Sequence, residues 1–306
     1  MSTANPLAVF ASNKKNANIK LLVKSVAFVI LLGCAFISLF PFLWMILSSF
    51  KSYAEINSPI PTVFPKTWVF GNFAEAWNEP DSTFSRYYWN TIVISIAGVG
   101  LQMGICIPAA YALATMKFRF KEVLFMGIVA TMMIPGDLTL VPNFMIIRGM
   151  PLMGGNDIFG VGGKGLYDSY MGIILPGLAS SFSIFLLRQA FMAIPRDYWQ
   201  AAQIDGMNHF GYMRRVVMPL SAATIITASL LAFIGRWNSL QWPLLITSSE
   251  HMRPLQVGLM FFRSEDGQSP QLIMAAATFC ILPILALYFF VQKQFTEAIV
   301  GAGVKG

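Results

Sequence analysis

Residues of the types that perform catalysis or bind metal ions are few in this sequence and widely spaced. The three cysteines, Cys34, Cys106 and Cys280, lie in apolar runs, in an odd number and without the spacing of a disulfide framework or a metal site. The two histidines, His209 and His251, have no second ligand at metal-binding spacing. The apolar runs contain neither a GxSxG nor an HExxH pattern, so intramembrane hydrolysis lacks a nucleophile or a metal. We therefore predict no catalytic residue, metal site or cofactor in this chain.

One glycine-rich segment, "IFGVGGKG" at 158–165, has partial similarity to a phosphate-binding loop. That loop requires GxxxxGK[ST], because its backbone N–H groups and its Lys surround the phosphates. Here Ile158 replaces the first Gly and Gly165 replaces the Ser or Thr. No apolar strand precedes the segment, so we predict that it does not bind a nucleotide.

Two charged residues, Asp137 and Arg236, stand inside long apolar stretches. Each would cost about 2.5–3.5 kcal/mol at the centre of a membrane helix. Charged side chains at such depth usually face a bundle interior or a water-filled cavity. We hypothesise that both line a central pathway and that they pair with each other.

The composition shows which elements must position these residues. The chain has 306 residues, 56% of them hydrophobic and only 11% charged, whereas a soluble domain is about 25% charged. Six stretches are long enough to cross a bilayer core of about 30 Å, namely 25–47, 90–114, 123–148, 171–191, 220–246 and 272–292. The sequence therefore predicts an all-α integral membrane fold with six transmembrane helices. The first stretch is too long for a signal peptide and is predicted to be a retained anchor.

The distribution of Lys and Arg predicts the orientation. With the N-terminus inside, the cytoplasmic side receives 13 of the 21 cationic residues and only four of the 14 acidic ones. We therefore expect a cytoplasmic N-terminal segment at 1–24, a transmembrane domain at 25–292 and a cytoplasmic C-terminal tail at 293–306. The net charge of +7 is explained by this topology, so no nucleic-acid partner is expected.

A polar segment, "MAIPRDYWQAAQIDGMNHFGYMRRVVMP" at 192–219, separates two apolar runs on the cytoplasmic side. Pro195 ends the preceding span, and Asp197 is the predicted N-cap of a helix that begins at Tyr198. Gly206 is the predicted C′ residue, and Asn208 is placed to cap a second short helix.

Tyr198, Ala201 and Ala202 share one face of that helix at i, i+3 and i+4 spacing. The small alanines would allow another protein to approach closely. A helical hairpin resting on the bilayer is the alternative.

This segment resembles the EAA loop of ABC-importer permeases, whose pattern is EAA, three residues, Gly, nine residues and I-x-L-P. The chain has Gln200-Ala201-Ala202, three residues, Gly206, nine residues and then Val216-Val217-Met218-Pro219. Gln200 replaces the Glu of the pattern and removes its charge. The segments "FSIFLLRQAF" (182–191), "FIGRWNSLQWPLLIT" (233–247) and "VGAGVKG" (300–306) are similar to the carbohydrate-uptake branch, specifically the maltose-type second permease subunit.

The resemblance implies a type I ABC importer permease fold in the bacterial inner membrane, forming half of a carbohydrate pathway. The implied partners are a homologous second permease subunit, an ATPase dimer that holds ATP and Mg, an extracytoplasmic solute-binding protein and the lipid bilayer. The implied ATPase-coupling residues are Gln200, Ala201, Ala202, Asp205, Gly206 and Pro219. The tail residues Gly301, Gly303 and Lys305 are expected either to contact the ATPase or to form a frayed terminus.

The resemblance bears on Arg236 as well, because the family more often carries an acidic or small residue there. Arg236 therefore suggests an anionic substrate as an alternative to pairing with Asp137. The neighbouring Trp237, Asn238 and Trp242 either line the pathway, since aromatic faces suit sugar rings, or serve helix packing and an interfacial aromatic belt. A secondary transporter working without an ATPase is the alternative function. It predicts inverted repeats or several intramembrane acids, of which only Asp137 is present.

Overall fold

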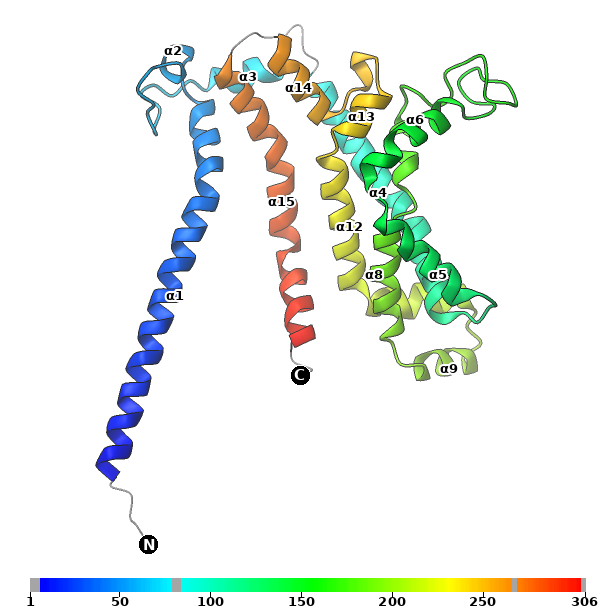
Figure 1. Ribbon diagram of the computed structural model, residues 1–306, viewed down its shortest axis with the longest axis horizontal. Helices are drawn as coiled ribbons and strands as arrows, with labels where there is room; N and C mark the ends of the chain where they lie inside the picture. The colour runs from blue at the N-terminus through cyan, green and yellow to red at the C-terminus, as the bar shows by residue number, and fades with distance from the viewer. Residues whose placement is uncertain (1–5, 79–83, 266–268, 304–306) are drawn as a thin grey trace. The chain divides into compact units, whose positions relative to one another are not determined.

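A computed structural model of the chain describes residues 6–78, 84–265 and 269–303, and all regular structure in these ranges is helical. The chain divides into two compact units (Figure 1). The first unit comprises residues 1–73 and 269–278, and the second comprises residues 74–268 and 279–306.

The first unit contains α1 (Pro6–Ser49), α2 (Tyr53–Ile56), the start of α3 (Gly71–Asn78) and the start of α15 (Pro270–Gly303). Helix α1 has 44 residues, or roughly 66 Å at 1.5 Å per residue, so it exceeds the thickness of a bilayer core. The helix therefore also runs through most of the predicted N-terminal segment 1–24. After α1, the Asn72 side chain donates to the carbonyl oxygens of Ser49 and Lys51, both at 2.8 Å, and fixes the turn.

The second unit is built on α4 (Phe84–Thr115), which packs against α8 (Ser181–Met192) and α12 (Ala222–Trp237). Its other helices are short. They are α5 (Lys121–Ala130), η1 (Thr131–Met133), η2 (Gly136–Thr139), α6 (Leu140–Arg148), α7 (Tyr170–Ile174), η3 (Leu175–Gly177), α9 (Asp197–Ile204), α10 (His209–Tyr212), the π-helix η4 (Met213–Val217), α11 (Met218–Leu220), α13 (Gln241–Ile246), η5 (Glu250–Met252) and α14 (Leu255–Glu265).

Among the residues that the structure describes, three helices are long and apolar enough to cross a membrane, at Val23–Ser49, Phe84–Thr115 and Pro270–Phe289. Three helix pairs pass the same test together but are bent, by 99° at 133–136, by 48° at 177–181 and by 83° at 220–222. Counting each bent pair as one span gives up to six, which is the predicted number.

Breaks between helices correct the predicted spans in two places. The stretch 220–246 is not one helix, because α12 ends at Trp237 with Asn238 as its C-cap and α13 begins only at Gln241. The stretch 171–191 is interrupted after Gly177, and Ser180 caps the new helix by accepting from the N–H of Ser183. The third span is also interrupted, at Ile134 and Pro135 between η1 and η2. Irregular backbone at membrane depth is tolerated where it lines a cavity.

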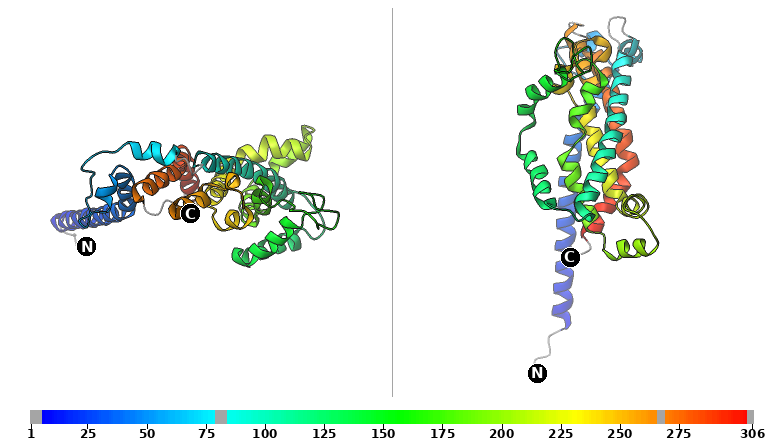
Figure 2. Two further views of the ribbon diagram at one scale, coloured as in Figure 1. Left: turned by 90° about the horizontal axis from the view of Figure 1, so that it is seen from above. Right: turned by 90° about the vertical axis from the view of Figure 1, so that its right-hand side faces the viewer.

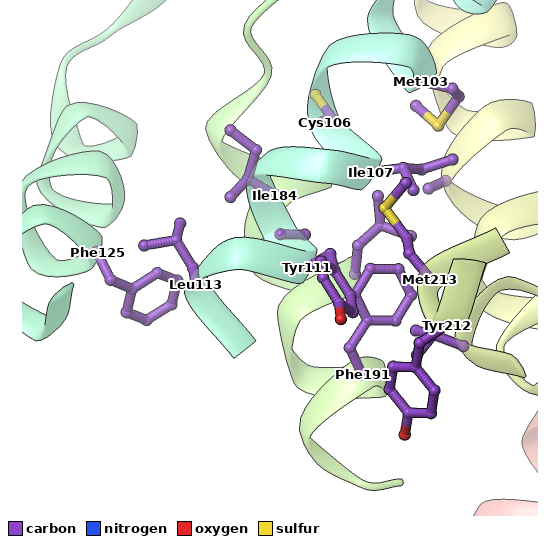
Figure 3. Close-up of a cluster of buried hydrophobic side chains, with 14 of the residues drawn as sticks. Met103, Cys106, Ile107, Tyr111, Leu113, Phe125, Ile184, Phe191, Tyr212 and Met213 are labelled. Atoms are coloured by element: carbon purple, nitrogen blue, oxygen red, sulfur yellow. The ribbon is translucent and has the colours of Figure 1, made fainter. Parts of the chain in front are cut away.

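The buried core of the second unit lies between α4, α8 and the α9–α11 segment (Figure 3). Tyr111, Phe191, Tyr212 and Met213 converge there. Figures 1 and 2 place α9 at one end of this unit and the glycine-rich segment 149–165 at the other end.

The glycine-rich segment is tightly turned. Gly165 has a φ of +57°, and a Cβ there would lie 2.4 Å from the carbonyl oxygen of Arg148, so only glycine fits. The buried side chain of Asn156 donates to the carbonyl oxygens of Arg148 and Met150 and accepts from the N–H of Gly163.

Candidate functional site

The two ends of α9 differ, because no side-chain hydrogen bond caps its start in the described structure whereas backbone hydrogen bonds close its end. Its N-cap is Arg196 and not the predicted Asp197, which instead occupies the first turn, where a negative charge interacts favourably with the helix dipole. At the other end Gly206, at a φ of +73°, donates to Gln203, and Met207 donates to Ala202 at 2.9 Å. These two bonds form a Schellman motif. The predicted C′ role of Gly206 is therefore confirmed.

The predicted cap of α10 is confirmed as well, because the Asn208 side chain accepts from the N–H of Gly211 at 2.8 Å. Four residues separate the two short helices, and both ends next to this connection are capped. The direction of the chain between α9 and α10 is therefore defined by hydrogen bonds.

A cluster of rings connects α9 to the membrane helices. Trp199 of α9 stacks on His209 at 4.4 Å and meets Tyr212 at 4.9 Å. His209 Nδ1 and the hydroxyl of Tyr111 of α4 form a hydrogen bond of 2.9 Å. We call these four residues the ring cluster. Because it joins α9, α10 and α4, a displacement of α9 is transmitted to α4.

The residues predicted to contact an ATPase do not share one exposed face. Gln200, Ala201, Asp205, Gly206 and Pro219 are exposed. Ala202, however, is 4% exposed and packs into the buried core of the second unit. Adjacent residues of a helix point about 100° apart, and here Ala201 lies on the exposed side of α9 while Ala202 faces the core.

Two exposed apolar residues on this segment were not predicted from the sequence. Ile204 is 87% exposed and Phe210 is 66% exposed, and they lie on either side of the exposed Gly206 in the sequence. Tyr198, at the start of α9, is half-exposed, and we refer to these three exposed side chains as the α9 surface. Large exposed apolar side chains outside the membrane spans are available for contact with another protein. The sequence signal that could have indicated them is an apolar residue on each side of Gly206, where α9 ends.

Gln200, which replaces the expected Glu, lies beside a cavity of about 630 Å³. Cationic and polar side chains line it together with core residues. Those with polar groups are Thr115, Lys117, Lys121, Arg196, Gln200, Gln203, His209 and Tyr212. Lys121 Nζ donates to the carbonyl oxygens of Ala114 and Met116, which holds it at the cavity edge.

A second cavity, of about 270 Å³, lies among the broken spans and contains Arg236 and Trp242 on its wall. Arg236 Nη2 donates to the side-chain oxygen of Gln102 at 3.1 Å and to the carbonyl oxygen of Gly177 at 2.9 Å. Trp242 Nε1 donates to the carbonyl oxygens of Gly172 and Ile173, both at 3.2 Å. We call this space the arginine cavity.

The hypothesised pairing of Asp137 with Arg236 is wrong. In the part of the chain that the structure describes, the one ion pair is Arg188–Glu122. Asp137 lies in the exposed 3₁₀ turn η2 after Pro135, whereas the guanidinium of Arg236 is directed at neutral oxygens of α4 and η3.

Two further predicted pathway residues lie away from the arginine cavity. Trp237 is 1% exposed, because its ring packs on Phe233 and Tyr88 and its Nε1 donates to the carbonyl oxygen of Cys280. It therefore serves helix packing, the alternative interpretation. Asn238 is exposed, and its side chain donates to the carbonyl oxygen of Ile234 at the end of α12.

The structure describes two of the three C-terminal residues that were predicted to contact an ATPase. Gly301 and Gly303 belong to the last turn of α15, and Lys305 lies outside the described residues. Their contact with an ATPase stays a prediction.

Most of the chain matches a known family of membrane proteins. Residues 104–300 match the model of the family described as "Binding-protein-dependent transport system inner membrane component". The arabinooligosaccharides transport system permease protein of Bacillus subtilis is 28% identical over 88% of this chain and 91% of its own length. The sulfoquinovosyl glycerol transport system permease protein of Agrobacterium fabrum is 29% identical over 88% of this chain and 89% of its own length.

A solved structure has the same fold. A chain of a bacterial ABC transporter involved in the import of the acidic polysaccharide alginate superposes with a TM-score of 0.74, at 24% identity, over 96% of this chain and 99% of that chain. The predicted permease fold is thereby confirmed.

Proposed function

This chain belongs to the family of inner membrane components of binding-protein-dependent transport systems, and from that premise we propose that it forms one half of the translocation pathway of a carbohydrate ABC importer. The relatives named for arabinooligosaccharides and for sulfoquinovosyl glycerol support a carbohydrate as the substrate class. The chain is a transport subunit, and the energy would come from a partner.

The proposed partners are a homologous second permease subunit, an ATPase dimer that holds ATP and Mg, and an extracytoplasmic solute-binding protein. We place the chain in the bacterial inner membrane with both termini in the cytoplasm, because this orientation satisfies the positive-inside distribution. In that orientation α9 faces the ATPase.

The observation that carries the proposal is the joint geometry of the α9 surface and the ring cluster. The capped helix α9 exposes Tyr198 and Ile204 for docking, while Trp199 on the same helix binds it to Tyr111 of α4 through His209. A helix held in this way moves as one rigid piece, which is how closure of an ATPase dimer would reach the spans. Gln200 would take part as a hydrogen-bonding group beside the adjacent cavity and not as a charge.

Copurification tests the proposal. The affinity-tagged chain is purified from its native membrane in mild detergent, and its partners are identified by mass spectrometry and by nucleotide hydrolysis. We expect an ATPase and a second permease to copurify, and uptake into proteoliposomes to require ATP and the solute-binding protein. Uptake by the purified chain alone, driven by an ion gradient without nucleotide, would establish the secondary transporter instead.

A further inference from the structure

The arginine cavity contains a positive charge that nothing in the described chain neutralises. The two acceptors of Arg236, the amide oxygen of Gln102 and the carbonyl oxygen of Gly177, are both neutral. Both hydrogen bonds come from Nη2, and Nε is buried without a partner. No carboxylate in residues 6–78, 84–265 or 269–303 forms an ion pair with this guanidinium. A cation at membrane depth is costly, so it is normally paired or functional.

The surrounding helices are shaped to hold this guanidinium. A Cβ on Gly98 of α4 would lie 2.8 Å from Cζ, Nε and Nη1 of Arg236, and one on Gly177 would lie 3.2 Å from Nη2. The guanidinium of Arg236 therefore occupies the space that a side chain at either glycine would need. Gln102 is itself held in place, because its Nε2 donates to Ser183 Oγ of α8 at 3.0 Å. Three elements thus fix the charge at the break between η3 and α8.

The rest of the cavity suits a sugar ring. Thr91, Asn143 and Ser239 supply polar groups to its wall, and the indole of Trp242 supplies a flat apolar face. The indole is oriented by its two hydrogen bonds to the backbone of α7. The volume of about 270 Å³ is close to the lower end of small-molecule pockets, about 300 Å³.

We propose that Arg236 supplies the positive charge with which this permease selects a carbohydrate carrying an oxyanion, such as a carboxylate, sulfonate or phosphate. The inference rests on the proposed function and specifies its substrate class. A guanidinium carries five N–H donors, and the two of Nη1 make no hydrogen bond to another described residue. These two are the groups that would meet an anionic oxygen atom, whereas Nε is buried beside Gly98.

Equilibrium binding to the complete importer in nanodiscs, without its solute-binding protein, tests the inference. The probes are galacturonate and glucose 6-phosphate, with galactose as the neutral probe, and the signal is tryptophan fluorescence at low salt. We expect both anions to bind at least tenfold more tightly than galactose. Arg236→Gln should remove that preference, and Arg236→Lys should keep part of it. Arg119→Gln is the matched control, because it removes the same charge from an exposed position outside the cavity.

Three results would overturn the inference. They are equal binding of the anions and galactose to the wild type, no binding of any probe, and an Arg236→Gln variant that loses all probes equally, which would show a structural arginine. Should Arg236→Gln fail to assemble, Gly98→Ala displaces the guanidinium and keeps its charge, and it should also weaken anion binding. Copurification of the ATPase is measured in a separate experiment. An importer that assembles with its ATPase but binds the anions and galactose equally would therefore refute this inference and leave the proposed function standing.

Discussion

The indole of Trp199 lies on the imidazole of His209, with ring centroids 4.4 Å apart and planes 15° from parallel. The same imidazole is hydrogen-bonded to Tyr111 of α4. These contacts join three short segments of sequence and connect α9 to the end of a 32-residue helix. Under the proposed function, they connect the loop that would receive force from an ATPase to the pathway.

Trp199→Ala is expected to uncouple transport from ATP hydrolysis. The change removes both ring contacts of α9, and aromatic pairs contribute about 0.5–1.5 kcal/mol each beyond the area they bury. The exposed α9 surface remains, so we expect the ATPase to copurify as before while uptake per ATP hydrolysed falls about tenfold, roughly 1.4 kcal/mol. Trp199→Tyr keeps a ring and serves as the control. Wild-type uptake in Trp199→Ala would show that the ring cluster does not transmit the motion.

Gly206→Leu is expected to weaken docking of the ATPase. Gly206 has a φ of +73° with no atom within 4 Å of a Cβ, so the penalty comes from the backbone, about 1–2 kcal/mol, and not from a clash. The Schellman bonds would be lost and Ile204 would be displaced. We expect less ATPase to copurify and uptake to fall severalfold, with normal insertion into the membrane.

Gly206→Asn provides the comparison for this prediction, because asparagine tolerates the left-handed region better than leucine. It should retain most of the copurified ATPase. Equal losses in the two variants would assign the effect to the size of the side chain and contradict the backbone explanation.

The number of spans and two of the helix caps could be predicted from the sequence, each for a different physical reason. Hydropathy predicted six spans, the number that the described residues reach when each bent pair counts as one, and local rules located the caps at Gly206 and Asn208, because those interactions involve neighbours in the chain. The interruption of the fifth span at 238–240 was missed, since an apolar pattern does not record backbone direction.

The partners of Arg236 were missed for another reason. Gln102 is 134 residues away in sequence and Gly177 is 59 residues away, and nothing local distinguishes a carbonyl or an amide as a guanidinium acceptor. The burial of Ala202 likewise depends on α4 and α8, so helix periodicity alone could not decide between the two alanines.

Arg188 and Glu122 are expected to contribute unequally to stability although they form one ion pair at 2.8 Å. Arg188 is buried, donates through Nε to the carbonyl oxygen of Leu113 and stacks 3.8 Å above the ring of Phe125. The Glu122 side chain is 65% exposed, so water replaces much of its interaction. We expect Glu122→Gln to cost under about 1 kcal/mol and Arg188→Ala about 3 kcal/mol or more. Thermal unfolding in one detergent measures both. Equal losses would show that the charge pair, and not the packing of Arg188, is what stabilises this region.

Asp168 is expected to stabilise the outer loops in a pH-dependent way. Its backbone N–H donates to the carbonyl oxygen of Ile246, and its carboxylate accepts from the N–H groups of Ser248 and Ser249 at 3.0 and 3.1 Å. Burial by itself raises the pKa of this carboxyl, but the hydrogen bonds from Ser249 and Ser248 and the charge of Lys164 together lower the pKa below its ordinary value.

A lowered pKa in the folded state means that the contribution of Asp168 is fully present above the unfolded value, about 3.9, and is lost as the pH falls through the folded value. Asp168→Asn should therefore speed hydrogen exchange at the amides of Ser248 and Ser249 at pH 5–8. The difference from the wild type should shrink below about pH 4, when the wild-type carboxyl also becomes neutral. Because the variant and the wild type are compared at the same pH, the pH dependence of the intrinsic exchange rate cancels. Asp157→Asn is the matched control, because its carboxylate accepts from the N–H groups of Phe159 and Val161 within the glycine-rich segment. A difference that grows as the pH falls would contradict this assignment.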